Sequence, residues 1–333
     1  MPKIFSIFSF TTVYPIPYTI YLIPTRGMPL SESQKQQVQT FFNQSHFDES
    51  GGVVTDLDGT AIHEFEGRYS IPQSVELGLN KIYELGRPVV LNTLRFPLSV
   101  IRTFGKEWYK ISNAPIPCVL LNGSQIGLIH QSSEDAFAFE EIDAFPLEKE
   151  EIQNTVKYVD TLVNDNVLDL LVFFYPRNWQ QGELIWTPRK EKIPDAEKKY
   201  LSAAKVFSSS IEDLEKSLME QPVCMIFLLV NIPQDKLMAY QHTKPSNFVV
   251  RKGVDKQFGA EKIAQALHFD LKHSVGAGDS AMDNFLNGVG LAVHVGNPYL
   301  NFEGVMPPVK ISNSSEFGEL LFQLAGMQRN VLH

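Results

Sequence analysis

Residues 53–63, VVTDLDGTAIH, place two aspartates directly after a short apolar run. The β-branched residues at 53–55 favour a buried strand, and Gly59 permits the chain to turn sharply after it. Asp56 and Asp58 lie two residues apart, so on an extended backbone their side chains point to the same side. Carboxylates this close repel each other unless a cation lies between them or one holds a proton. The stretch therefore predicts a strand that ends in a reactive or metal-binding loop.

The sequence on either side alternates between apolar strands and amphipathic helices. Strands are predicted at residues 87–95 and 117–127, and helices at 74–86 and 97–111. After residue 246 the pattern resumes with a strand-like segment at 247–253, a helix at 255–269, a strand, loop and helix over 273–290, a strand at 291–297 and a final helix at 314–327. This alternation predicts an α/β fold, a Rossmann-like, doubly wound parallel sheet with crossover helices.

The middle of the chain has a different character and predicts an inserted α+β cap domain at residues 128–246. Its expected elements are helices at 147–165 and 210–220 and strands at 167–176, 182–188 and 222–232. The catalytic core is then predicted at residues 50–127 and 247–333, preceded by an N-terminal extension at 1–49 with an apolar start followed by a helix. No internal repeat is evident.

Composition narrows the class of protein. The 333 residues are 44% hydrophobic and 20% charged, which is typical of a globular chain with a sizeable core. The net charge of −9 argues against a nucleic-acid partner, which would favour a basic surface. Cys118 and Cys224 fit neither a disulfide framework nor a zinc site, so we expect buried free thiols and a cytoplasmic protein.

The first 27 residues are apolar and aromatic, and three origins stay open for them: a targeting segment, a part of the fold, or a start assigned too early, before Met28. Three prolines, at positions 15, 17 and 24, interrupt the run, so a membrane-spanning helix is not expected. Ser31 followed by Gln34 is the pattern of a helix start with a capping box.

Polar residues also follow other predicted strands of the core. Thr93 and Arg95 end one strand, in LNTLR, and Asp279 and Asp283 lie in the glycine-rich loop GAGDSAMDNF. Lys256 opens a predicted helix. Ligands of open parallel sheets bind at the carboxyl ends of the strands, so these residues are expected to share one site. Acidic loops of this kind suit a hard cation such as Mg²⁺.

Taken in order, the DxDGT loop, the strand-end Thr, the helix-opening Lys and the GDxxxD loop resemble the four motifs of the haloacid-dehalogenase-like (HAD) superfamily. The resemblance is closest to its Cof-type and sucrose-phosphatase-like branch, which carries an α/β cap between the second and third motifs. NGSQIG (122–127) and GVDKQFGA (253–260) resemble further segments of that branch. The resemblance covers about residues 50–325.

The resemblance implies a role for each acidic residue. Asp56 would be the nucleophile that takes up the phosphoryl group, which divides one difficult displacement into two easier ones. Asp58 would be the general acid for the leaving alcohol and then the base for water. The cofactor would be Mg²⁺, held by the Asp56 carboxylate, the Asp58 backbone carbonyl and Asp279. Asp283 would support Lys256 or a metal-bound water.

The resemblance further implies a substrate-binding set made of Thr93, Arg95, Asn122 and Lys256. The predicted function is a Mg²⁺-dependent phosphatase that hydrolyses a small phosphorylated metabolite, such as a sugar phosphate. A phosphotransferase or phosphomutase of the same fold, or a catalytically weak binding or regulatory protein, are the alternatives. The cap would select the substrate, and its candidate contacts are Tyr175, Arg177, Trp179, Trp186 and Arg189. The sequence indicates neither the physiological substrate nor the oligomeric state.

Three positions depart from the family pattern. Leu94 stands where a glycine is usual in the second motif, and Met282 where an asparagine precedes the last aspartate of the fourth. Asn297 is expected to take the place of a later family asparagine. None of these changes removes a group that would touch the phosphate or the metal, so we expect an active enzyme.

Overall fold

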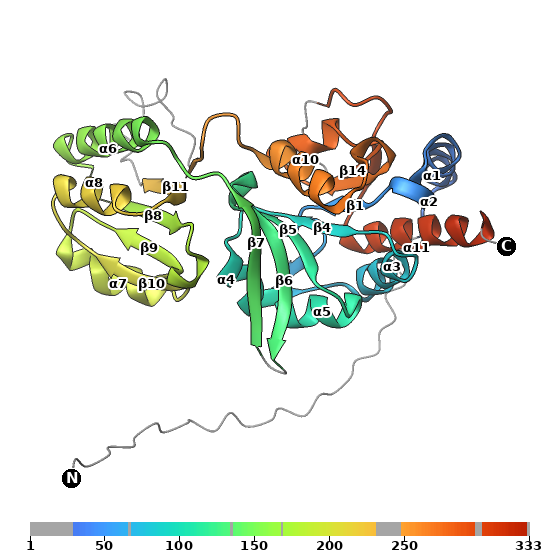
Figure 1. Ribbon diagram of the computed structural model, residues 1–333, viewed down its shortest axis with the longest axis horizontal. Coiled ribbons are helices and arrows are strands. Elements are labelled where there is room, and N and C mark those ends of the chain that lie inside the picture. Colours follow the sequence, from blue (N-terminus) through green and yellow to red (C-terminus); the bar gives the residue numbers. More distant parts are fainter. Residues whose placement is uncertain are drawn as a thin grey trace, which may run out of the picture.

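The computed structural model describes residues 29–65, 68–133, 136–167, 169–230, 248–296 and 302–331. Within these ranges the chain forms an eight-stranded sheet, a five-stranded sheet and a short two-stranded hairpin (Figure 1). Our predictions for residues 1–27 and for Asn297 lie outside the described residues. Among the helices in these ranges, none is long and apolar enough to cross a membrane.

The eight-stranded sheet has the order β15-β14-β13-β1-β4-β5-β6-β7. The six strands from β15 to β5 run parallel, and β6 and β7 are antiparallel additions at one edge. This sheet confirms the predicted α/β fold class. Its strands are β1 (Val53–Thr55), β4 (Val89–Asn92), β5 (Ile116–Leu120), β6 (Gln125–Ser133), β7 (Ala136–Ala144), β13 (Val275–Gly278), β14 (Leu291–Val295) and β15 (Val309–Ile311).

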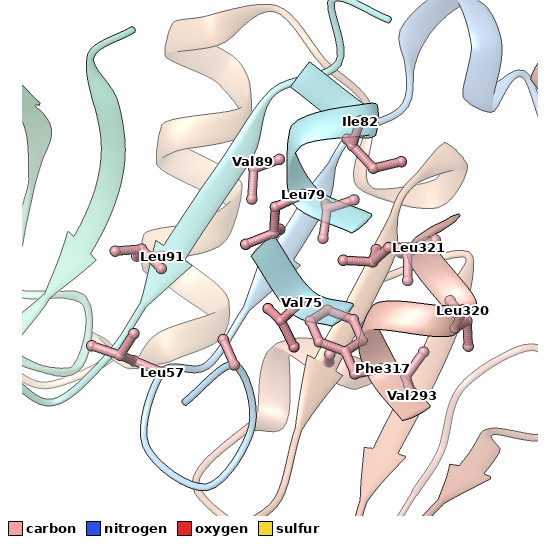
Figure 2. Close-up of a cluster of buried hydrophobic side chains, with 14 of the residues drawn as sticks. Leu57, Val75, Leu79, Ile82, Val89, Leu91, Val293, Phe317, Leu320 and Leu321 are labelled. Atoms are coloured by element: carbon pink, nitrogen blue, oxygen red, sulfur yellow. The ribbon is translucent and has the colours of Figure 1, made fainter. Parts of the chain in front are cut away.

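Helices cover both faces of this sheet, which explains why its central parallel strands are mostly apolar along their length. On one face, Val53 and Leu91 pack with α3 (Gln73–Glu84), α5 (Lys106–Ser112) and α11 (Ser314–Val331). Figure 2 shows side chains of α3 and α11 meeting over the strands. On the other face, Val54 and Val90 pack with α10 (Lys256–Leu267). Opposite faces of each strand therefore belong to two separate apolar cores.

The N-terminal part of the described chain adds two helices to the first of these cores. α1 (Glu32–Gln44) begins at Ser31 with the predicted capping box, since Ser31 and Gln34 bond each other's backbone amide. α2 (Phe47–Ser50) leads into β1, and the hairpin β2 (His63–Phe65) and β3 (Arg68–Ser70) follows the aspartate loop. Phe47 is fully buried in the same core.

The five-stranded sheet has the order β10-β9-β8-β11-β12. α6 (Lys149–Asn164) and α8 (Ile211–Met219) cover one face. The other face packs with α7 (Ile193–Lys199) and with Phe96 and Leu121, which come from loops of the first sheet. The strands are β8 (Leu170–Pro176), β9 (Glu183–Trp186), β10 (Ala203–Phe207), β11 (Val223–Val230) and β12 (Phe248–Val249).

The structure shifts the expected start of the insert. The predicted boundary at residue 128 falls inside β6, and β7 also belongs to the first sheet up to residue 144. The reason is a tight turn at Leu121–Gly123 whose three residues all have positive φ, so the chain reverses at once and pairs with β5. With this shift, the division into a core and a cap stays our prediction.

Some local predictions also differ from the structure. Within the segment 247–253, expected in the core, Phe248–Val249 form β12, which pairs antiparallel with β11 of the second sheet. The helix expected at 97–111 is divided into α4 (Pro97–Val100), a π-helical turn at Ile101–Gly105 and α5. The helix expected after the GDxxxD loop is a single 3₁₀ turn, Asn284–Asn287. Cys118 and Cys224 are buried and free, as predicted.

Candidate active site

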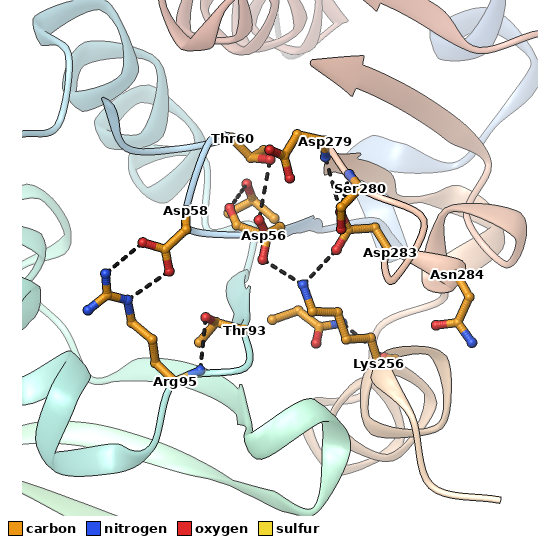
Figure 3. A network of polar contacts seen from close by, with 12 residues as sticks. Asp56, Asp58, Thr60, Thr93, Arg95, Lys256, Asp279, Ser280, Asp283 and Asn284 are labelled. Atoms are coloured by element: carbon orange, nitrogen blue, oxygen red, sulfur yellow. Dashed lines mark hydrogen bonds and ion pairs between the residues drawn. The ribbon is translucent and has the colours of Figure 1, made fainter. Parts of the chain in front are cut away.

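Three adjacent parallel strands end at the same edge of the first sheet and carry the predicted residues. Asp56 follows β1, Thr93 follows β4 and Asp279 follows β13, and β1 lies between β4 and β13. Figure 3 shows these side chains close together, with Lys256 reaching in from the start of α10. The parallel topology therefore brings together residues that are up to 223 positions apart in the sequence.

Lys256 lies at the centre of the site and is 1% exposed. Its Nζ lies 2.6 Å from Asp56 Oδ1 and 2.6 Å from Asp283 Oδ1. Burial alone would lower the pKa of this amine, but the Asp56 and Asp283 carboxylates outweigh burial and raise its pKa. The ammonium group is therefore charged at neutral pH and bridges the two carboxylates.

Asp56 is also buried, with 5% of its surface exposed. Burial raises the pKa of its carboxyl to about 7, against the opposing effect of Lys256; Asp283 and Asp279 add to the rise. The site thus holds more negative charge than its single ammonium group balances. A carboxylate in this position gains from any further cation placed beside it.

Asp283 is tied into its own loop as well as to Lys256. Its Oδ2 accepts hydrogen bonds from the backbone amides of Asp279, at 3.0 Å, and Ser280, at 2.9 Å, and from the Ser280 hydroxyl at 3.1 Å. A Cβ on Gly278 would lie 2.6 Å from the Asp283 Cβ, so only glycine fits there. Asp283 therefore fixes the loop that presents Asp279.

The carboxylates of Asp56, Asp279 and Asp283 fit a divalent cation. Each offers an oxygen, and these oxygens lie within 4.8 Å of one another. Both Asp283 oxygens accept short hydrogen bonds, whereas Asp56 Oδ2 accepts only a long one, from Thr60 Oγ1 at 3.5 Å, so Asp56 and Asp279 are the pair best placed to bind an ion. Gly59 has φ of +80°, and a Cβ there would lie 2.1 Å from Asp279 Oδ2, so the loop leaves room for that carboxylate. Oxygen ligands of this kind suit Mg²⁺.

Asp58 does not share the partners of Asp56. Its two oxygens accept hydrogen bonds from Arg95, from Nε at 2.7 Å and from Nη2 at 2.6 Å. The guanidinium group lies 5.0 Å from the ring centre of Tyr69 and 5.1 Å from that of Phe104. Figure 3 shows the Asp58 side chain pointing toward Arg95. The structure thus places Arg95, predicted to bind substrate, on the predicted acid.

Thr93 and Asn122 follow the ends of the neighbouring strands β4 and β5. Thr93 is 1% exposed, and its Oγ1 accepts the Arg95 amide at 3.2 Å. The Asn122 amide donates to the Thr93 carbonyl at 3.4 Å, and Asn122 adopts a left-handed conformation with φ of 56°. Both predicted residues are therefore near the site, held by backbone contacts between the ends of β4 and β5.

Sequence reasoning missed several residues that hold this arrangement. Asn92 is fully buried, and its Nδ2 donates to the Lys256 carbonyl at 2.9 Å. Asn284 bonds the start of α10, and Tyr69 stacks on Arg95. Asn92 and Asn284 directly precede or follow a predicted site residue, and this adjacency is the one signal that could have found them.

The departures Leu94 and Met282 do not occupy the site itself. Leu94 is half-buried and packs in the apolar cluster that Phe96 and Leu121 form with the second sheet. Met282 is 41% exposed. Neither side chain displaces Asp56, Lys256 or Asp279 from the contacts described above.

The candidate substrate contacts on the second sheet have different surroundings. Trp186 is fully buried on the face covered by α6 and α8, so its predicted contact with substrate is wrong. Arg177 pairs with Glu141 at 2.7 Å. Tyr175 packs against Phe96, with ring centres 5.2 Å apart, so it lies on the face turned toward the first sheet. Trp179 meets Phe139 edge to face, and Arg189 pairs with Glu191.

Comparisons with known proteins agree with this geometry. Residues 53–299 match the family model of haloacid dehalogenase-like hydrolases. No curated protein matches the chain significantly in sequence.

Three solved structures illustrate the shared fold. A HAD subclass IIB sugar phosphatase aligns over 85% of this chain and 99% of its own, with 16% identity and a TM-score of 0.57. A HAD phosphatase from Bacteroides thetaiotaomicron covers 83% and 96%, with 14% identity and a TM-score of 0.57. A HAD/COF-like hydrolase from Plasmodium vivax covers 89% and 100%, with 15% identity and a TM-score of 0.59. The predicted resemblance is confirmed: the chain belongs to the haloacid dehalogenase-like hydrolases.

Proposed function

We propose that this protein hydrolyses the phosphate monoester of a small metabolite and that Asp56 is the nucleophile. The observation that supports this most directly is the buried contact of Asp56 with Lys256, together with an Asp279 oxygen that lies within 4.8 Å of an Asp56 oxygen. A buried carboxylate beside one ammonium group and a second carboxylate is suited to attack an anionic phosphorus centre once its own charge is balanced.

In the first step an Asp56 oxygen attacks phosphorus and the bond from phosphorus to the leaving oxygen breaks. Asp58 gives its proton to that oxygen, so the alcohol leaves neutral. In the second step Asp58 takes a proton from water, the water oxygen attacks phosphorus, and the bond to Asp56 breaks. Asp56 and Asp58 then return to their starting states, with alcohol and phosphate as products.

Lys256 and Thr93 bind the transferring phosphoryl oxygens in this proposal. Lys256 contacts Asp56 directly, and Thr93 is at the end of the adjacent strand β4. The cofactor is Mg²⁺, which Asp56, Asp279 and the Asp58 carbonyl would bind. When bound, the ion balances negative charge that otherwise keeps the nucleophile and the phosphate apart.

Arg95 holds the Asp58 carboxylate by two hydrogen bonds, a geometry that an arginine supplies and a lysine does not. For Asp58 to donate a proton, this pair must open or the proton must arrive with the substrate. We propose that the substrate phosphate and its leaving group compete with Asp58 for Arg95. Arg95 then binds the substrate in place of Asp58, so Arg95 stays in the proposed substrate-binding set, together with Asn122.

A sugar phosphate is the substrate class that we favour. Structural neighbours include a sugar phosphatase, and the second sheet turns an aromatic face, with Tyr175, toward Phe96 beside the site. This sheet and its helices would form the cap that selects the leaving group. A cytoplasmic location is part of the same proposal.

The test is phosphate release from a panel of phosphorylated metabolites, with Mg²⁺ or with EDTA. Asp56→Asn should release no phosphate, while Asp160→Asn, a change on the helix α6, should behave as the wild type. Turnover that survives Asp56→Asn would refute the proposed nucleophile. Adding a sugar as an acceptor separates hydrolysis from transfer, since a new phosphorylated product would replace part of the free phosphate.

A further inference from the structure

We propose that Asn284 is a positioning residue that holds Lys256 in place, a role that rests on the proposed function of Lys256 in phosphoryl transfer. Asn284 directly follows Asp283 in the sequence, and it touches neither Asp56 nor the predicted metal site in any contact described above. Its partners are instead the residues on either side of Lys256. The amide thus joins the loop of Asp283 to the first turn of α10.

The contacts satisfy both ends of the Asn284 amide. Oδ1 accepts the backbone amide of Gln257 at 3.1 Å, and Nδ2 donates to Asp255 Oδ2 at 2.7 Å. The other Asp255 oxygen caps the helix by accepting the Phe258 amide at 2.8 Å. The first turn of α10 therefore has two of its amide donors satisfied, one by its own cap and one by the neighbouring loop.

Two parallel links then join the same pair of segments. Lys256 Nζ contacts Asp283 Oδ1 through its side chain, and Asn284 bonds the residues before and after Lys256. The first link alone would leave the lysine backbone free to shift, because its side chain has many rotamers. With the second link, the helix start and the loop move together, and the ammonium group stays between Asp56 and Asp283.

Asn92 supports the same backbone from another side, through its hydrogen bond to the Lys256 carbonyl. The peptide group between Lys256 and Gln257 is therefore held at both of its polar atoms, at the carbonyl by Asn92 of β4 and at the N–H by Asn284 of the Asp283 loop. Displacing a catalytic group by about 1 Å can reduce a rate on the order of a hundredfold. Loss of one of two anchors should have a smaller effect, about tenfold in kcat.

The experiment exchanges the two side chains of the hydrogen bond between Asn284 Nδ2 and Asp255 Oδ2. Asn284→Asp keeps an oxygen for Gln257 but sets a carboxylate against Asp255. The double variant Asp255→Asn with Asn284→Asp restores one donor and one acceptor, and its new asparagine can still cap Phe258. Asp255→Asn alone is the matched control, because it keeps the oxygen that caps Phe258 but sets an amide donor against Asn284 Nδ2, so this hydrogen bond is lost without an added negative charge.

Two readouts are measured on the full chain. The first is the rate at which acetic anhydride labels the Lys256 amine, read by mass spectrometry against the exposed Lys252. The second is kcat and KM for phosphate release. The labelling of the buried Cys118 thiol is measured alongside and reports general opening of the fold, since this thiol reacts only when the core is exposed.

We expect Asn284→Asp to raise Lys256 labelling several-fold with Cys118 unchanged, and to lower kcat about tenfold with little change in KM. The double variant should regain both values to within about twofold. The added negative charge by itself would slow labelling, so faster labelling indicates a displaced amine.

Three results would overturn the inference: unchanged labelling in Asn284→Asp, labelling of Lys256 and Cys118 that rises in parallel, or a double variant that fails to recover. A wild type without phosphatase activity would overturn the proposed function instead. In that case the labelling rates still decide whether Asn284 holds Lys256.

Discussion

In metal-free protein, replacing Asp56 with Asn should stabilise the fold relative to the wild type by an amount that grows as pH rises. Asp56 is buried, and its pKa is raised from 3.8 to about 7, chiefly by burial. In the wild type the folded state therefore binds a proton that the unfolded state has already released. Asparagine has no proton to exchange, so its stability lacks this dependence.

The sign follows from proton binding in the two states. Between pH 3.8 and about 7 the folded state holds more protons at Asp56, so the contribution of this group to stability decreases as pH rises. Below this window the carboxyl is protonated in both states, so it does not change stability with pH. Above the window it is ionised in both states, and the folded state bears the full free-energy cost of a buried, charged Asp56. One pKa unit corresponds to about 1.36 kcal/mol, so the difference between variant and wild type should change by at most about 4 kcal/mol across the window.

The assay is urea unfolding in EDTA at several pH values from 4.5 to 8. The free energy of unfolding of Asp56→Asn minus that of the wild type should rise toward pH 7 and then level off. Asp160→Asn should follow the wild type throughout. Adding Mg²⁺ should move the wild-type window to lower pH, since a cation favours the ionised carboxylate. A difference that is constant or decreasing with pH would refute our account of Asp56.

Three further changes test the surrounding structure. Gly59→Ala should weaken Mg²⁺ binding at least tenfold by calorimetry, because its Cβ would lie 2.1 Å from Asp279 Oδ2; unchanged affinity would show that Asp279 does not bind the ion. Arg95→Lys keeps the charge but loses the two-point contact, so kcat should fall about tenfold in the phosphate-release assay. Gly318→Ala should lower the free energy of unfolding by about 1–3 kcal/mol, because its Cβ would lie 2.2 Å from the backbone of α3. Gly326→Ala, on the same helix with open space around it, is the control and should not destabilise.

Much of the fold could be predicted because the relevant signals are local. The runs around residues 53, 89 and 275 are mostly apolar and do not alternate with polar residues, which is typical of strands buried on both faces. Helical spacing is equally clear in α3, α6 and α11. The same runs end in Asp56, Thr93 and Asp279, so the parallel order of the strands was enough to predict that these residues share one edge.

The elements that were missed depend on contacts distant in sequence. The sequence predicted that the insert starts within β6, but β6 pairs with β5 because of the left-handed turn at Leu121–Gly123. β12 is two residues long, and its place in the second sheet depends on β11. Such short strands have no periodicity of their own, so only the pairing partner decides where they belong.

The sequence by itself determined the family, the α/β class and the set of charged residues in the site. Only the tertiary structure decided how those charges are paired: Lys256 between Asp56 and Asp283, Arg95 on Asp58, and an asparagine amide bracing the start of α10. Motif spacing specifies which positions along the backbone carry the charged residues. The partner of a long side chain depends on which groups burial brings within about 3 Å, because a hydrogen bond weakens steeply beyond that distance.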